Sequence, residues 1–173
     1  SALLRIAQIE AGTRRAEFAE VDLSVVANAV VDAFTPSAED EQKTINSHVA
    51  PSVKVNGDKD LLTQMIANLV ENSIRHNSPG TRIDLSVETR ARGPVVVVAD
   101  NGPGVPEDMR IKVMQRFYRL ERSRTTLGTG LGLSLVAAIA DLHGAKVKLR
   151  DNQPGLKAVI EFGWKPLEAP HMM

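Results

Sequence analysis

The chain has 173 residues, which is enough for one domain with a hydrophobic core and a short appendage. It carries 21 Lys and Arg against 21 Asp and Glu, and 43% of its residues are hydrophobic. The zero formal net charge and the lack of a basic stripe argue against a nucleic-acid-binding protein. Cysteine is absent, which excludes disulfides and thiolate metal sites, and no apolar run approaches the roughly 20 residues that span a bilayer. We therefore expect a soluble globular domain without direct membrane contact.

The first 20 residues are expected to be an appendage to this domain. Residues 1–12 have the apolar spacing of a helix that ends at Gly12. Twelve residues are marginal for an isolated helix, so we expect this segment to belong to a longer one. Residues 13–20 are polar and are expected to form a linker.

Hydrophobic periodicity predicts the elements that follow. Apolar residues at helical spacing from Leu23 to Phe34 predict a helix with Asp22 as its N-cap. Pro36 is expected to disturb the end of this helix, with helical character resuming through residues 37–43. Further helices are expected at residues 58–77, 106–118 and 130–143, and strands at residues 45–49, 53–55, 83–87, 95–99, 145–150 and 156–162.

The order of these elements predicts an α+β two-layer sandwich, in which helices cover one face of a mixed β-sheet. The strand at residues 83–87 alternates apolar and polar residues, as a half-buried strand does. The strand at residues 95–99 is continuously apolar and β-branched, which predicts burial on both faces.

Two asparagines lie near the apolar side of the helix expected at residues 58–77. Asn72 projects inside the apolar arc and Asn68 lies at its edge, four residues away, so the two amides lie one above the other. A buried polar group without a partner costs about 1–3 kcal/mol. Either a metal–phosphate group or a neighbouring strand or loop can supply the partners. Glu71 projects toward solvent and is expected to be a surface charge.

A carboxylate follows the buried strand, because Asp100 comes directly after residues 95–99 and precedes Gly102 and Gly104. Asp100 can accept a hydrogen bond from an exocyclic amine such as that of adenine. The glycines let the backbone pass close to a ring or a phosphate. The alternative is a hairpin turn at Asn101-Gly102, although the following Pro103 makes a tight two-residue hairpin awkward.

Three alternating glycines, Gly128, Gly130 and Gly132, lead into the last expected helix. Exposed backbone N–H groups and the positive end of the helix dipole favour an anion at such a position. The spacing differs from the dinucleotide-binding fingerprint. The chain also contains no Walker A motif and none of the signature motifs of eukaryotic-type protein kinases. If the chain handles ATP, it therefore does so by another architecture.

Taken in order, these segments resemble the boxes of the ATP-binding catalytic domain of sensor histidine kinases. Residues 68–76 resemble the N box, residues 100–104 the first glycine box, residues 116–119 the F box and residues 128–133 the second glycine box. The resemblance covers about residues 21–165. It implies the Bergerat fold, which this family shares with the gyrase, Hsp90 and MutL ATPases. It also implies a protein-histidine kinase catalytic domain that uses ATP and Mg²⁺.

By this resemblance, Asp100 would bind the adenine amine, in a pocket shaped by Gly102 and Gly104. Asn72 would hold the Mg²⁺ that bridges the phosphates, with Asn68 assisting, since amide oxygens suit this hard cation. Two basic residues belong to the same box. Arg75 would face the phosphates, and His76 stands where many members have a tyrosine in the adenine pocket. An imidazole can still stack on the base, so we expect binding to survive with altered affinity; a structural or exposed role is the alternative for His76.

The resemblance also places an ATP lid at about residues 105–127, anchored by Phe117 beside Tyr118. Arg119, Arg122 and Arg124 would be cations that neutralise the γ-phosphate, and solvated loop charge is the alternative for them. The phosphates would be cradled by Gly128, Thr129, Gly130, Leu131 and Gly132.

Asn68 bears on the reaction as well as on binding. Relatives that hydrolyse ATP usually carry a glutamate at this position as the general base on water, and an asparagine cannot act as a base. The residue therefore favours a kinase, with Asn68 and Arg119 as the residues closest to the chemistry. A Bergerat-fold ATPase of the gyrase, Hsp90 or MutL type and a non-catalytic nucleotide-binding module are the alternatives.

The family's acceptor box, a histidine followed by an acidic residue and Arg-Thr-Pro, is absent from the chain. The resemblance implies that residues 1–20 are the end of the dimerisation helix plus a linker, and that residues 21–173 are the catalytic domain. We expect a monomer that binds ATP but does not phosphorylate itself. The implied partners are ATP, the parent's own dimerisation domain and a response regulator, and the implied location is the cytoplasmic side of a membrane-bound sensor.

Overall fold

The fold is built on a mixed five-stranded sheet with the strand order β2-β4-β5-β7-β6. A computed structural model describes residues 17–104, 107–110 and 130–163. The strands are β1 (Ala19–Asp22), β2 (Thr44–Val49), β3 (Lys54–Gly57), β4 (Arg82–Arg90), β5 (Gly93–Asp100), β6 (Lys146–Asp151) and β7 (Leu156–Glu161), and the helices are α2 (Leu23–Asp40), α3 (Lys59–Arg75) and α5 (Gly130–Leu142). Strand β2 pairs with β4 in parallel, and the other neighbours in this sheet are antiparallel.

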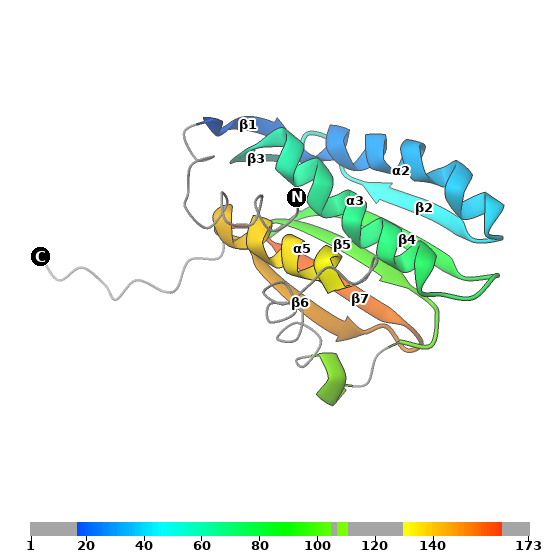
Figure 1. The fold of residues 1–173 in the computed structure, drawn as a ribbon. Coiled ribbons are helices and arrows are strands. Elements are labelled where there is room, and N and C mark those ends of the chain that lie inside the picture. The colour runs from blue at the N-terminus through cyan, green and yellow to red at the C-terminus, as the bar shows by residue number, and fades with distance from the viewer. Residues whose placement is uncertain (1–16, 105–106, 111–129, 164–173) are drawn as a thin grey trace, which may run out of the picture.

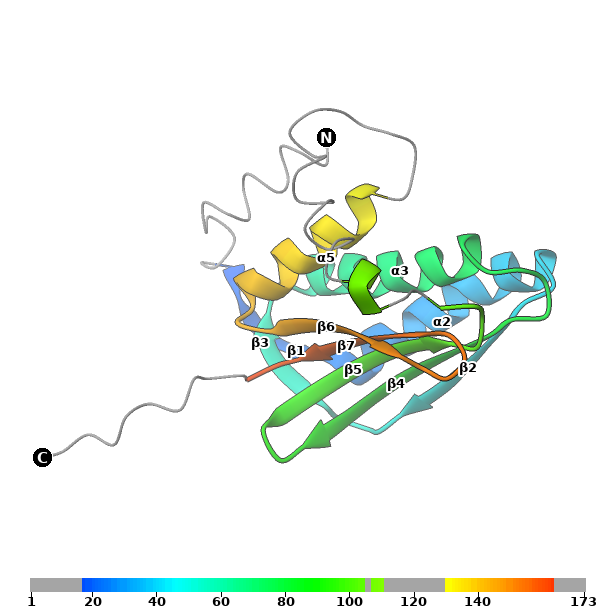
Figure 2. The same ribbon diagram turned by 90° about the horizontal axis from the view of Figure 1, so that it is seen from below.

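The three long helices lie on one face of the sheet, as Figures 1 and 2 show. The predicted two-layer α+β sandwich with a mixed sheet is therefore confirmed. A helical turn at residues 107–110 falls within the helix expected at residues 106–118, and the rest of that prediction lies outside the described residues.

Strand β5 is buried on both faces, as its apolar run predicted. Val96 and Val98 belong to the main core under the helices, whereas Val95, Val97 and Ala99 form a small cluster with Val159 on the opposite face. Charged side chains of the outer strands border this second cluster, including an ion pair in which Lys148 Nζ lies 3.1 Å from Glu161 Oε1. The sheet therefore presents a polar surface on the side away from the helices.

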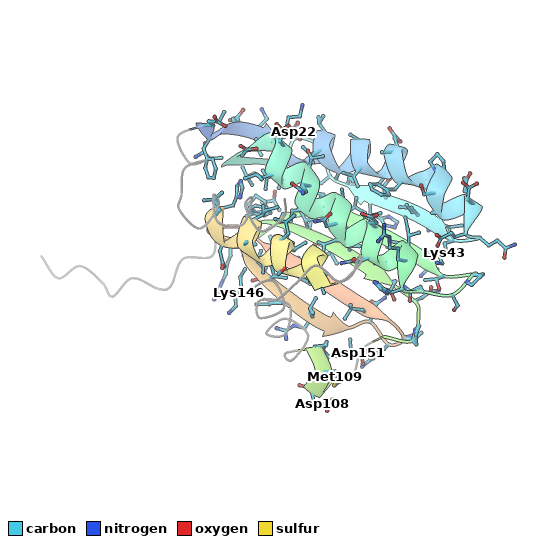
Figure 3. All side chains as sticks on the ribbon, in the orientation of Figure 1. Asp22, Lys43, Asp108, Met109, Lys146 and Asp151 are labelled. Carbon is cyan, nitrogen blue, oxygen red and sulfur yellow. The ribbon has the colours of Figure 1, made fainter. Side chains whose placement is uncertain are left out.

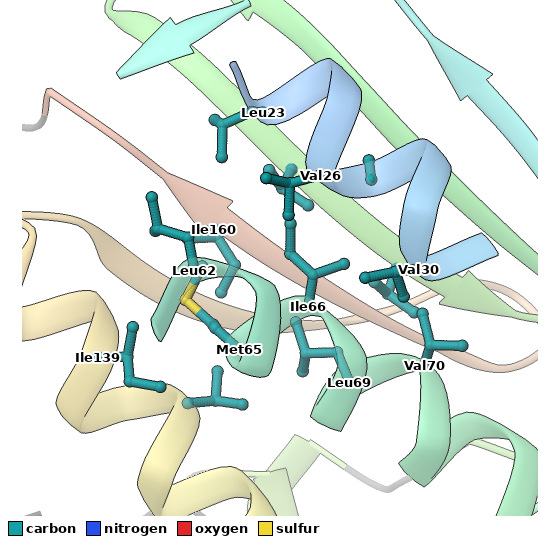
Figure 4. Packing of buried hydrophobic residues seen from close by; sticks show 14 of the residues in the cluster. Leu23, Val26, Val30, Leu62, Met65, Ile66, Leu69, Val70, Ile139 and Ile160 are labelled. Carbon is teal, nitrogen blue, oxygen red and sulfur yellow. The ribbon is translucent and has the colours of Figure 1, made fainter. Parts of the chain in front are cut away.

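Helix α3 lies at the centre of the helical layer and supplies much of the core. Its predicted apolar arc is confirmed, because none of its members is more than 3% exposed. Figure 4 shows part of this arc between α2, α5 and the sheet, where it packs against residues such as Val26, Ile139 and Ile160. The arc comprises Leu61, Leu62, Met65, Ile66, Leu69 and Val70. This packing fixes both the height of α3 above the sheet and its rotation.

Helix α2 begins as predicted, and the helical character expected after Pro36 is confirmed as far as Asp40. Asp22 is its N-cap, and the Asp22 carboxylate accepts hydrogen bonds from the backbone N–H groups of Ser24 and Val25. The expected disturbance at Pro36 was wrong, since the helix continues to Asp40. A proline inside a helix removes the bond to the carbonyl four residues earlier, here that of Asp32. Both residues are exposed, so water can satisfy that carbonyl.

The linker expected at residues 13–20 was wrong at its end, because Ala19 and Glu20 belong to strand β1. This strand pairs antiparallel with β3 in a separate two-stranded sheet beside the helical layer, with Ala19 opposite Gly57 (Figure 1). The preceding Phe18 packs against the core and stacks on the ring of His143, with ring centroids 4.7 Å apart. Residues 1–16 lie outside the described residues.

The C-terminal end of α3 is held by three separate donors. The last carbonyls of a helix have no partner within the helix. Here the His76 N–H bonds to Asn72 O at 3.0 Å, Asn77 Nδ2 bonds to Ser73 O at 2.8 Å, and the Lys43 ammonium donates to Ile74 O. Lys43 is only 4% exposed, and its ammonium also lies 2.9 Å from the Glu41 carboxylate. Figure 3 labels Lys43 near this end of α3.

We predict that Lys43→Met lowers the free energy of unfolding by about 1–3 kcal/mol, because Ile74 O loses a buried charged donor. Lys59→Met is the matched control, since Lys59 is exposed on the first turn of α3. That control should change stability by less than about 0.5 kcal/mol. Urea denaturation of both variants measures the difference, and equal stability of the two variants would contradict the role of Lys43.

Candidate functional site

A cavity of about 300 Å³ opens between the C-terminal half of α3, the end of β5, the first turns of α5 and strands β6 and β7. Its apolar lining comprises Leu69, Val98, Pro103, Leu133, Leu149, Leu156 and Ala158, and its polar side chains are Asn72, Ser73, His76, Asn77 and Asp100. An apolar cavity with a few converging polar groups is typical of a site for a small organic ligand.

Asp100 is the buried carboxylate of this cavity and is 5% exposed. Its Oδ1 accepts hydrogen bonds from the backbone N–H of Gly102 at 3.0 Å and from that of Leu156 at 3.2 Å. Its Oδ2 has no hydrogen-bond partner within the part of the chain that the structure describes. One oxygen is therefore held by the backbone, and the other is available to a donor in the cavity.

The segment after Asp100 is not a hairpin turn, because β5 pairs with β4 and β7 and the chain leaves the sheet at residue 101. Gly102 passes so close to α3 that a Cβ on it would lie 1.8 Å from Asn77 Oδ1. Gly104, which lines the cavity, has a φ of +76°, a conformation that side chains with a Cβ rarely adopt. Both glycines thus let the backbone lie close to neighbouring protein groups, and the predicted approach to a ring or a phosphate stays a prediction.

The polar residues of α3 divide into two groups. Asn72 lines the cavity and is half-buried, and its side chain forms no hydrogen bond with any other described residue. Asn68, one turn earlier, is also half-buried and does not line the cavity, and its amide likewise has no partner among those residues. The alternative in which a neighbouring strand or loop satisfies these amides finds no support in that part of the chain.

Arg75 and His76 lie at the exposed end of α3. Arg75 forms an ion pair with Glu71, with Arg75 Nη2 2.7 Å from Glu71 Oε1, and does not line the cavity. Glu71 is therefore a surface charge, as its helical position predicted. His76 is the C-cap of α3 and does line the cavity, with an exposed ring at its rim.

The glycine-rich segment is only partly described. Helix α5 begins at Gly130 and includes Leu131 and Gly132, so the expected helix N-terminus is present beside the cavity, which Leu133 lines. The predicted residues Phe117, Tyr118, Arg119, Gly128 and Thr129 lie outside the described residues, together with Arg122, Arg124 and most of the expected lid.

Several lining residues were not predicted from the sequence. Ser73 lies beside Asn72 on α3, and Asn77 follows the C-cap of that helix, so their closeness to Asn72 in the sequence could have identified them. Leu149, Leu156 and Ala158 come from the last two strands, and only the sheet order brings them under α3.

The chain belongs to the family of histidine kinase-, DNA gyrase B- and HSP90-like ATPases, whose model matches residues 57–169. It is 34% identical over 173 residues to the probable sensor histidine kinase TcrY of Mycobacterium tuberculosis, and the match covers 96% of this chain and 36% of that protein. The predicted ATP-binding catalytic domain of a histidine kinase is thereby confirmed. The curated relatives are much longer, since the chain spans about two fifths or less of the first of them.

Solved structures agree with this assignment. The catalytic domain of histidine kinase ThkA has a TM-score of 0.73 at 26% identity, covering 84% of this chain and 94% of that domain. Full-length ShkA in complex with AMPPNP has a TM-score of 0.71 at 25% identity, covering 88% of this chain and 32% of ShkA. Among the described residues, no helix combines the length and apolar character that a membrane span requires.

We predict that Gly102→Ala weakens ATP binding at least tenfold, because the new Cβ collides with Asn77 Oδ1 and displaces a wall of the cavity. Adding Asn77→Ala to this variant removes the colliding oxygen and should restore part of the affinity. Gly80→Ala is the control, since Gly80 has a φ of +91° but no atom within 4 Å of the new Cβ. It should lower stability without changing affinity. Calorimetry on the four proteins measures the effect, and unchanged binding by Gly102→Ala would contradict it.

Proposed function

We propose that this domain binds Mg²⁺-ATP in the cavity below α3 and donates the γ-phosphoryl group to a histidine of its parent's dimerisation domain, in two-component signalling. The observation that carries the proposal is Asp100. It is a buried carboxylate with one oxygen held by two backbone N–H groups and the other available within an apolar cavity. The family match and the AMPPNP bound by ShkA support the choice of nucleotide.

Asp100 would select the base. An ionised carboxylate only accepts hydrogen bonds, so Oδ2 suits the exocyclic amine of adenine and repels the carbonyl that guanine carries at the same position. The apolar residues around it, such as Val98 and Leu156, would cover the faces of the ring. Selection rests on a group that folding has already desolvated and oriented, so little ordering is needed on binding.

Asn72 would hold Mg²⁺ at the phosphate side of the cavity. Its half-buried amide has no partner among the described residues, which fits a ligand that supplies one. The same part of the chain contains no cluster of three or more His, Asp or Glu suited to a metal. That composition fits Mg²⁺, which keeps waters and phosphate oxygens as most of its ligands. When bound, the ion neutralises charge on the phosphates.

The remaining phosphate contacts follow from the family resemblance. Backbone N–H groups at the start of α5, from Gly130 to Gly132, would face the phosphates, with Gly128 and Thr129 before them. Asn68 would assist Asn72. Phe117, Tyr118 and Arg119 would belong to the lid at about residues 105–127. Arg75 would reach the phosphates only by leaving Glu71, because the two side chains form an ion pair.

Transfer to a protein histidine is favoured over hydrolysis. Among the described residues that line the cavity, Asp100 is the only carboxylate, and backbone N–H groups hold it at the base end. Asn68 cannot take a proton from water, and the neighbouring Glu71 is paired on the surface. The acceptor would come from the dimerisation domain of the parent protein, to which residues 1–20 would connect residues 21–173. A response regulator would receive the phosphoryl group at the cytoplasmic face of a membrane.

Calorimetry with ATP, with and without Mg²⁺, tests the two ends of the site separately. Asn72→Ala should remove most of the Mg²⁺-dependent part of the affinity. Asp100→Asn should weaken binding about tenfold or more. The amide oxygen of the new side chain would accept the two backbone N–H groups, so its NH₂ group would face the adenine amine, and two donors cannot form a hydrogen bond. Asn28→Ala on the exposed face of α2 is the control and should bind like the unchanged chain. Unchanged ATP binding by both Asn72→Ala and Asp100→Asn would contradict the proposed site.

The phosphotransfer step needs a separate test. The chain should be mixed with ATP labelled at the γ-phosphate and with the dimerisation domain of its parent protein. We expect acid-labile label on the acceptor histidine and no steady release of phosphate without the acceptor. Tight ATP binding without labelled histidine would favour a non-catalytic nucleotide-binding module, and rapid phosphate release by the chain alone would favour an ATPase.

A further inference from the structure

We propose that the turn between β6 and β7, residues 152–155, supports the nucleotide site from outside the cavity, with Asn152 as the positioning residue for Asp100. The inference rests on the proposed function, in which Asp100 binds the adenine amine. Asn152 Nδ2 donates a hydrogen bond of 2.7 Å to the backbone carbonyl of Asp100, a residue 52 positions earlier in the chain. Figure 3 labels Asp151, the last residue of β6, directly before this turn.

The turn and Asp100 are joined at three points. Besides the Asn152 bond, the Leu156 N–H donates to Asp100 Oδ1 at 3.2 Å, just after the turn. Between them, Gly155 is buried and has a φ of +109°, and a Cβ on it would lie 1.8 Å from the Asp100 carbonyl oxygen. The turn thus contacts both the backbone and the carboxylate of Asp100.

The Asn152 side chain is not needed to close the turn itself. The Asn152 N–H already bonds to Gly155 O at 3.0 Å, and Asp151 Oδ1 accepts from the Gln153 N–H at 3.0 Å. The side-chain amide of Asn152 instead reaches across to the end of β5. Its bond therefore acts on Asp100 rather than on the local conformation of the turn.

The same turn also supports the next wall of the cavity. A Cβ on Gly104 would lie 2.8 Å from Gly155 O, so the loop after β5 packs directly on the turn. Loss of the Asn152 bond frees the carbonyl end of Asp100, while the bond from Leu156 still holds the carboxylate. The free Oδ2 of Asp100 is then held less firmly in position, and its hydrogen bond with the adenine amine becomes weaker.

A ligand that lacks the amine separates this positioning role from a general loss of structure. Asn152→Ala should weaken ATP binding about three- to tenfold, the usual effect of one hydrogen bond. Binding of purine riboside triphosphate, which lacks the 6-amino group, should change less than twofold. In an Asp100→Asn background, Asn152→Ala should have no further effect on ATP affinity, because the hydrogen bond between the Asp100 carboxylate and the adenine amine is already lost.

Asn101→Ala is the matched control. Asn101 also uses its side chain to bond a backbone group, since Asn101 Oδ1 accepts from the Arg82 N–H at 2.7 Å, and it neighbours Asp100 in the chain. The Asn101 side chain makes no hydrogen bond to Asp100. Asn101→Ala should therefore leave the ratio of the affinities for ATP and purine riboside triphosphate unchanged. All titrations are made well below the unfolding temperature of the weakest variant.

The outcomes distinguish this inference from the proposed function. If Asp100→Asn discriminates between ATP and the deamino analogue but Asn152→Ala does not, the positioning role of Asn152 is wrong and the proposed function stands. If Asn152→Ala weakens both nucleotides equally, its role is structural and the inference is again wrong. If Asp100→Asn fails to discriminate between the two nucleotides, the assignment of Asp100 to the amine is wrong and the inference falls with it.

Discussion

The packing of α3 against the sheet is the constraint on which the site depends. Six apolar side chains on one arc of this helix are almost fully buried, so the helix can neither roll nor slide without opening the core. Its Asn72 and Ser73 line the cavity because the buried arc fixes the rotation of the helix, and Asn77 lines it just beyond the C-cap. The donors at its C-terminal end, including the buried ammonium of Lys43, hold the last turn in place. A core interaction thereby sets the geometry of a polar site.

The base end of the cavity is built largely from the backbone. One oxygen of Asp100 accepts hydrogen bonds from two backbone N–H groups. The nearby glycines lie so close to neighbouring atoms that a Cβ at these positions would collide with them. Backbone groups within a sheet move little, so this end is organised before any ligand arrives. The residues that would contact phosphate come instead from α3 and from the start of α5. The two ends of the proposed nucleotide site therefore depend on different layers of the fold.

Features set by local periodicity were predictable from the sequence, and features set by distant contacts were not. The arc of α3, the N-cap Asp22 and the doubly buried β5 follow from spacing alone and are confirmed. Strand β1 has only four residues, Ala19–Asp22, which is too short a run for its alternation of apolar and polar residues to be recognised, and it exists through its pairing with β3. The sequence therefore predicted a linker over its first two residues. Helix α2 passes Pro36 because its exposed side tolerates a missing hydrogen bond. The pairing of Arg75 with Glu71 needed a side-chain rotamer that helical spacing does not specify.

The contact between Asn152 and Asp100 is another feature that could not be predicted from the sequence, because it joins distant parts of the chain. In the sequence, residues 151–155 have the composition of a turn, and nothing in that segment points to a residue 52 positions away. The sheet order places β7 between β5 and β6, and the end of β5 therefore meets the turn that joins β6 to β7. In the proposed site, the topology of the last hairpin would thus contribute to nucleotide selection through Asp100, although the hairpin itself carries none of the family's sequence boxes.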